Sequence, residues 1–386
     1  DQRIEIVREG EYIAVARTDD ENWGLADRSL FPIRQDVLRP LVVSVAGLQP
    51  IEVKTSKPEY HERLALWNPD PAGDPIEPPP PDPRADPRQP PPQEPAQPTR
   101  IRVFGENDAL LADVILGETA LRNGSRATFV RKADEDQTWL ASGLVSASTE
   151  ISHWIERDLF RVERNDVLEM TVRRPDGERY TLVRQDPPTD PRLAGRPGAN
   201  RPSWVLERLP RGREMGDQFT AESVVGALAF ASVIDVQPAS EPVPLDVEPG
   251  SATVVTEDGL ELTVTVWHRD AFDPADADSA APPDPAQTEA IPAAAWVEVK
   301  ASGEGAEEIS TKVEGWRFEV SPSAGRNLLR PLEDLLAEQE EGAEDAADRR
   351  PGAPPAQFGP MFEGLQQPRP QQSPNTPSDG SSDGRR

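Results

Sequence analysis

The chain has 386 residues, enough for two or three domains, but 44 prolines and a hydrophobic fraction of 36% mean that much of it cannot be packed core. A formal net charge of −28 would repel phosphate backbones and anionic lipid headgroups, so we expect no nucleic-acid partner. The absence of cysteine excludes disulfides, thiolate metal sites and cysteine nucleophiles.

Membrane attachment is not visible in the sequence itself. No run of about 20 apolar residues occurs, so no segment of this sequence is predicted to span a bilayer. The first residue is Asp1 rather than Met. We therefore expect that an N-terminal signal or anchor segment precedes it.

The first half of the sequence predicts a hairpin, a helix, a strand, a second hairpin, two more strands and a short helix. The ranges are residues 3–7 and 12–17, 35–48, 51–54, 101–104 and 110–116, 127–131 and 137–141, and 151–160. Apolar residues of 35–48 recur at helical spacing, and Pro40 falls in the first turns, where a missing N–H is tolerated.

The second half repeats that order of elements. The ranges are residues 167–173 and 179–184, 221–231, 233–236, 253–256 and 261–268, 295–300, 316–320, and 327–336. Asp-Gly turns separate the strands of both hairpins, and Thr220 is the predicted N-cap of the first helix. We therefore predict an α+β fold built of two tandem related copies, residues 1–160 and 161–337.

Three segments lack the pattern of a packed core. Residues 68–99 form a Pro-rich insertion, and residues 270–291 form an acidic, proline-bearing one. Residues 338–386 are acidic and then rich in Pro, Gln, Ser, Gly and Asp, which predicts a disordered tail.

Motifs that would carry chemistry are weak. His268-Arg269-Asp270 spells the tripeptide of a kinase catalytic loop, but the other kinase motifs are missing. His61, His153 and His268 have no metal-site spacing, and the acidic run 273–278 lacks the Gly and Glu of a calcium loop. Acidic residues are too numerous for the sequence to select a catalytic pair. We predict no catalytic, cofactor-binding or metal-binding residues and no cofactor.

Tryptophans fall at similar places in the two halves, namely Trp23 and Trp139 in the first and Trp204 and Trp316 in the second. Similar places favour a shared packing role over a ligand platform.

Several short motifs carry a family resemblance. They are Thr55-Ser56-Lys57-Pro58-Glu59-Tyr60, residues 64–69 (LALWNP), Leu116-Gly117, Phe129-Val130-Arg131 and Leu159-Phe160. With them the chain resembles the bacterial family called domain of unknown function 4340. The resemblance implies an extracytoplasmic body behind one N-terminal transmembrane helix, often encoded beside transporters of the ATP-binding-cassette type. It supplies no catalytic residue.

The expected function follows from these patterns. We expect a non-enzymatic interaction module of the bacterial cell envelope, with a single-pass inner-membrane anchor and a periplasmic body. Its expected partners are subunits of a membrane transporter or an envelope assembly. The alternative is a glycan-binding or hydrolytic envelope protein that uses carboxylates and tryptophans in a cleft between the two copies. A third possibility is a structural spacer.

Overall fold

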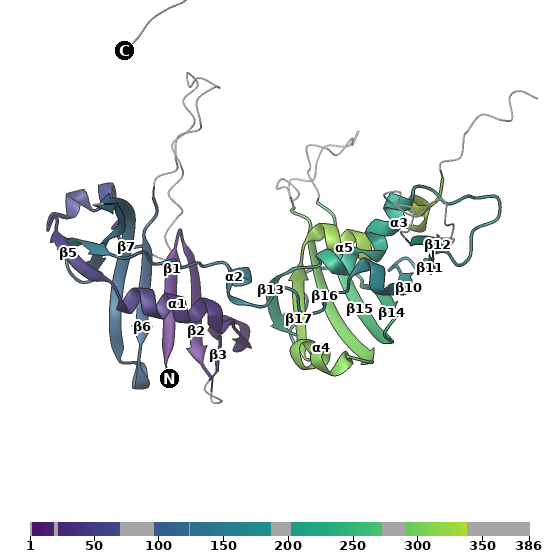
Figure 1. Ribbon diagram of the computed structural model, residues 1–386, viewed down its shortest axis with the longest axis horizontal. Coiled ribbons are helices and arrows are strands. Elements are labelled where there is room, and N and C mark those ends of the chain that lie inside the picture. The colour runs from purple at the N-terminus through teal and green to yellow at the C-terminus, as the bar shows by residue number, and fades with distance from the viewer. Residues whose placement is uncertain are drawn as a thin grey trace, which may run out of the picture. The chain divides into compact units, whose positions relative to one another are not determined.

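The computed structural model describes residues 2–18, 22–69, 96–122, 124–186, 202–271 and 291–337. These residues form two large antiparallel sheets with few helices, which confirms the α+β class (Figure 1). Most of both predicted insertions, the acidic run 273–278 and the tail 338–386 lie outside the described residues. The first insertion ends earlier than predicted, because Thr99 is already the buried first residue of a strand.

The first sheet has nine strands in the order β4-β3-β2-β1-β6-β7-β8-β9-β5. Their bounds are β1 Arg3–Arg8, β2 Glu11–Arg17, β3 Trp23–Leu25, β4 Phe31–Pro32, β5 Gln49–Val53, β6 Thr99–Phe104, β7 Leu110–Arg122, β8 Ser125–Lys132 and β9 Thr138–Ser142. The predicted strands of the first half overlap these strands, whereas β3 and β4 were not predicted.

The second sheet has eight strands in the order β12-β11-β10-β14-β15-β16-β17-β13. Their bounds are β10 Val167–Arg173, β11 Arg179–Gln185, β12 Ser203–Leu206, β13 Val233–Pro238, β14 Gly250–Thr256, β15 Leu260–Arg269, β16 Ala294–Gly303 and β17 Trp316–Val320. Alternation explains the strands: in β15 Leu260, Leu262, Val264 and Val266 are buried, while the residues between them are not.

Helices cover one face of each sheet. They are α1 Gln35–Ala46, α2 Ile151–Trp154, α3 Gln218–Val225, α4 Ala306–Val313 and α5 Pro322–Leu328. Between the edge strands β4 and β5, α1 crosses the first sheet and buries Leu38 and Leu41 against it (Figure 1). Among the described residues, every helix is too short or too polar to cross a membrane.

The predicted helix 151–160 is wrong beyond Trp154. Ile155 is extended, at φ −103° and ψ 160°. The carbonyl of Trp154 accepts a hydrogen bond from the amide of Arg34 (2.7 Å), and that of Arg157 accepts one from Val233 (3.0 Å). Because neighbouring elements take these carbonyls, they are not available to an i+4 ladder. Leu159 and Phe160 enter the core from this extended segment.

Two other helix predictions need correction. The helix predicted over 221–231 is α3 followed by a 3₁₀ turn after Gly226, and Asp217 rather than Thr220 caps it by accepting from the amide of Phe219. The helix predicted over 327–336 is α5 and a separate 3₁₀ turn, because Pro331 has no N–H to continue the ladder. The amphipathic α4 was not predicted.

Candidate functional site

The motifs that carry the family resemblance hold one connection against the first sheet. Residues 54–69, which we call the strap, follow β5. The amide of Thr55 donates to Oγ1 of Thr138 (3.0 Å), which in turn donates to the carbonyl of Thr55 (2.9 Å). Nε2 of the buried His61 lies 3.0 Å from the carbonyl oxygen of Asp136. A Cβ on Gly117 would lie 2.1 Å from the carbonyl oxygen of Leu64, so the strap crosses β7 where only glycine fits.

Arg131 of β8 fixes the end of the strap. Its Nε donates to the carbonyl of Leu66 (2.6 Å), and its Nη1 donates to the carbonyls of Lys132, Ala133 and Glu135. Burial lowers the pKa of this guanidinium, since the charged form has lost most of its water. The motif residues Thr55, Gly117 and Arg131 thus have a structural role.

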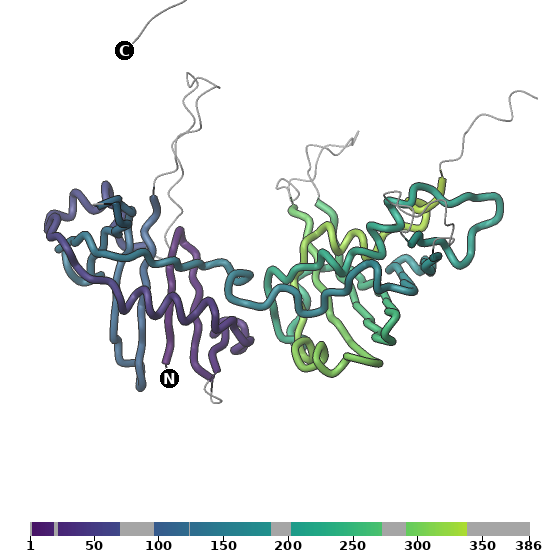
Figure 2. Tube along the Cα trace, viewed as in Figure 1, coloured from purple at the N-terminus to yellow at the C-terminus, as the bar shows by residue number. Residues whose placement is uncertain are grey.

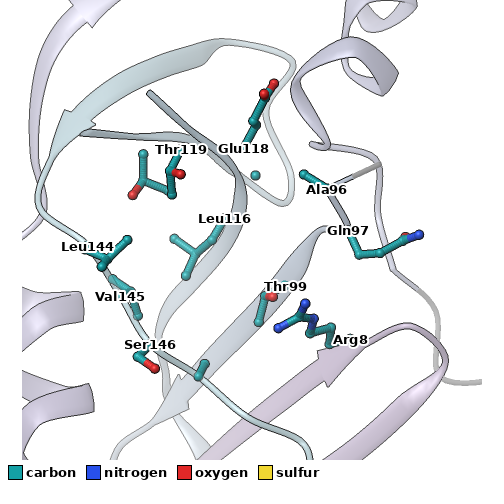
Figure 3. Close-up of a pocket in the computed structure, with 13 residues that line it drawn as sticks. Arg8, Ala96, Gln97, Thr99, Leu116, Glu118, Thr119, Leu144, Val145 and Ser146 are labelled. Carbon is teal, nitrogen blue, oxygen red and sulfur yellow. The ribbon is translucent and has the colours of Figure 1, made fainter. Parts of the chain in front are cut away.

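An open groove lies on the α1 side of the same sheet. It has a volume of about 610 Å³ and is lined from β1, β6, β7 and β8 and from the chain after β9. Figure 3 shows Leu144, Val145 and Ser146 along one side and Gln97 and Arg8 along the other. We call it the polar groove. Its size falls within the range of ligand-binding clefts.

Hydroxyl groups give the polar groove its chemistry. Thr99, Thr119 and Thr128 line it around the apolar Leu116. Oγ1 of Thr128 donates to the carbonyl of Gly143 (2.9 Å), which holds the start of the 144–147 segment in place.

Charge in the polar groove is sparse. Arg8 lies beside Glu9, with Nε 3.2 Å from Oε1, and Glu118 is an acidic member of the lining. Such a lining offers hydrogen bonds to a polar ligand rather than a paired acid and base.

The chain after β9 forms one wall as it leaves the first sheet. From Gly143, beside β8, it runs to Thr149, whose hydroxyl donates to Glu11 of β2 (2.6 Å), and then into α2 (Figure 2). No backbone hydrogen bond joins residues 144–147 to another described residue. Within the described part of the chain, the main-chain donors and acceptors of this wall therefore have no backbone partner.

A second, smaller groove of about 370 Å³ lies along α1 and is mostly apolar. Trp23, Val42, Phe104 and Leu111 are among its lining residues. Trp23 therefore contributes to a surface groove as well as packing partly against the core.

The three histidines stay apart. His61 belongs to the strap, His153 lies edge-on to the ring of Trp154, and His268 is the last residue but one of β15. Within the described part of the chain, no group of three or more His, Cys, Asp or Glu side chains is arranged to hold a metal ion.

The residues of the His268-Arg269-Asp270 tripeptide help to fasten α5. Oδ1 of Asp270 lies 3.2 Å from Nε2 of His268 and accepts from Nε of Arg326 in α5 (3.0 Å). Burial would raise the pKa of Asp270, but the hydrogen bonds from His268 and Arg326 leave it below the usual value.

The other three tryptophans that fall at similar places in the two halves lie in packed surroundings. Trp204 is fully buried, Trp139 is partly buried against the core, and Trp316 packs edge-on against Phe31 at a centroid distance of 4.9 Å.

None of the groove's threonines was predicted from the sequence to be a site residue. In sequence they are ordinary strand residues, and only the fold brings them together. One signal lay in the two similar hairpins, residues 101–116 and 253–268. Thr99 and Thr119 lie next to the first hairpin, whereas Gly250 and His268 stand at the matching positions of the second.

The fold is that of a mixed α+β protein with two large antiparallel sheets, and a polar groove lies on the first of them. The chain belongs to the family described as domain of unknown function (DUF4340), whose sequence model matches residues 23–248, and this confirms the resemblance. The match begins at β3 and ends before β14, so it takes in parts of both sheets. No curated protein and no solved structure matches the chain.

Proposed function

We propose that the protein is a non-catalytic interaction module whose polar groove receives part of a partner protein. The observation that carries the proposal is the groove itself, about 610 Å³ of open space lined by threonine hydroxyls and by backbone without a partner among the described residues. The proposed partners are subunits of a membrane transporter of the ATP-binding-cassette type or of an envelope assembly. The proposed location is the bacterial envelope, with a periplasmic body and a single-pass inner-membrane anchor.

We also propose that the fold consists of two tandem related copies, residues 1–160 and 161–337. Support comes from the strand orders, which agree when β1–β3 are matched to β10–β12 and β5–β9 to β13–β17. Only β4, at the edge of the first sheet, has no counterpart among the described strands. Trp23 and Trp204 then take the same place, opposite Arg17 and Arg184.

The same matching separates the other two tryptophans. The pairs Val130–Trp139 and Val297–Phe318 place Phe318, rather than Trp316, as the counterpart of Trp139. With this matching, Trp316 lies two residues before the counterpart of Trp139 instead of sharing its place.

Site-specific photo-crosslinking tests the function in the full-length, membrane-anchored protein. A photoreactive residue replaces Glu118 in the groove, and a control replaces Glu261, exposed on β15 of the other sheet. We expect an adduct with a transporter or envelope subunit from position 118 and none from position 261. Equal yields from both positions, or recovery of glycan fragments in place of a protein, would contradict the proposal.

A further inference from the structure

The floor of the polar groove has a counterpart on the second sheet. The cross-strand row Arg8–Thr99–Leu116–Val130–Trp139 corresponds to a row running Gly250–Val266–Val297–Phe318. Arg174 extends the second row. It follows Arg173, which pairs with Ser251, so the antiparallel register continued by one residue places Arg174 opposite Gly250. The adjoining pair Thr119–Thr128 corresponds to His268–Ala295.

On the second sheet, the chain itself covers this patch. Helix α5 packs on β15 and β16, and a Cβ on Gly325 would lie 2.4 Å from the side chain of Ala295. Leu329, just after α5, lies so close that a Cβ on Gly250 would be 2.5 Å from it. Arg174 completes the contact by donating from Nη1 to the main-chain carbonyl of Leu329.

On the first sheet, five of the seven matching residues line the open groove instead. Arg8, Thr99, Leu116, Thr119 and Thr128 are all among its lining residues. Arg8 stands where Arg174 stands on the other sheet, and there the arginine binds a peptide carbonyl. At the position where the second sheet binds a segment of its own chain, the first sheet thus has an open groove.

The floor favours an extended segment over a helix. Thr99 and Thr128 occupy the places of Gly250 and Ala295, whose small size lets Leu329 and α5 approach closely. Their bulkier β-branched side chains would therefore obstruct a helix packed in the same way. From β8 to β1 the floor crosses three strand spacings, about 14 Å, which about four extended residues span. The backbone of 144–147, which has no backbone hydrogen-bond partner among the described residues, can pair with such a segment in the manner of an added strand.

We infer that the polar groove binds an extended segment of the partner polypeptide through main-chain hydrogen bonds, and that Arg8 donates to one of its carbonyls. This inference rests on the proposed function and names what enters the groove.

Short random peptides displayed on phage provide the probe. The peptides are selected on the full chain and counter-selected on the Thr119→Trp variant, whose indole fills the groove from an exposed position. The control variant is Leu121→Trp, because Leu121 is exposed two residues further along β7 and lies outside the groove. We expect peptides that bind the wild type and Leu121→Trp but not Thr119→Trp. Failure to enrich any such peptide would overturn the inference.

The selected peptide is then resynthesised with each amide methylated in turn. Loss of one main-chain hydrogen bond should weaken binding about fivefold, at alternate positions as in a strand. Arg8→Gln should weaken it about tenfold, because a charged donor is lost, and the exposed Arg126→Gln should leave it unchanged. Tolerance of methylation at every position, or binding independent of Arg8, would overturn the inference. The proposed function would still stand if the crosslink from position 118 to a partner were observed.

Discussion

Arg131 is a buried charge that is solvated by backbone rather than by a carboxylate. Only 7% of the residue is exposed, and its guanidinium serves the carbonyls of the strap and of the turn after β8. The planar guanidinium suits this task, because its donors are fixed in several directions at once. The residue therefore links two loops that the strands alone do not connect.

Replacing Arg131 by Met should lower the free energy of unfolding by about 2 kcal/mol, because buried carbonyls lose their donor and this outweighs the relief from burying a charge. Arg131→Lys should not restore it, since an ammonium group cannot reach the same carbonyls. Urea unfolding followed by circular dichroism measures both. Arg126→Met, exposed on the same strand, is the control and should change the value by less than about 0.5 kcal/mol. An equally small effect of Arg131→Met would show that the strap does not depend on it.

At the scale of elements, the strand pair β13 and β17 carries two facing carboxylates. Asp235 pairs in register with Glu319, and Arg28 from the turn after β3 binds Asp235 through two hydrogen bonds of 2.8 and 2.9 Å. Glu319 has no such partner among the described residues. Burial, with a smaller contribution from the charge of Asp235, raises the pKa of Glu319 above 4.5.

Glu319→Gln should therefore stabilise the protein at neutral pH. A raised folded-state pKa means that the ionised carboxylate costs stability above that pKa, and that the cost disappears as pH falls below 4.5, where both states are protonated. The melting temperature of the variant should exceed that of the wild type at pH 7 and match it at pH 4. Glu261→Gln, exposed on β15, should show no such difference. A gain of equal size at both pH values would contradict the assignment to ionisation.

Most strands could be predicted because their alternation records which face is buried, as in β15. Helix ends could not, because distant contacts decide them: the amide of Arg34, more than 100 residues away in sequence, takes the carbonyl at which α2 ends. The polar groove was out of reach for the same reason. Thr99, Thr119 and Thr128 become one surface only when β6, β7 and β8 are in register and the chain after β9 crosses over them.

At the scale of the whole molecule, the two sheets share one hydrophobic core cluster among the described residues. Phe31 of β4 packs edge-on against Trp316 and Phe318 of β17, with centroid distances of 4.9 and 6.0 Å. Phe160, from the segment after α2, also meets Phe318 at 5.7 Å. The family match, which takes in parts of both sheets, agrees with a unit in which neither sheet is independent.

A shared core predicts that both sheets unfold together. Calorimetry of the wild type should give one transition whose calorimetric and van't Hoff enthalpies agree. Phe31→Ala should remove about 3 kcal/mol or more of packing between β4 and β17 and split the transition into two, one for each sheet. The neighbouring Leu30→Ala, at a position 40% exposed, should keep a single transition. Two transitions in the wild type would show that the sheets are independent domains, and a single lowered transition in Phe31→Ala would show that Phe160 and the Arg28–Asp235 pair suffice to couple them.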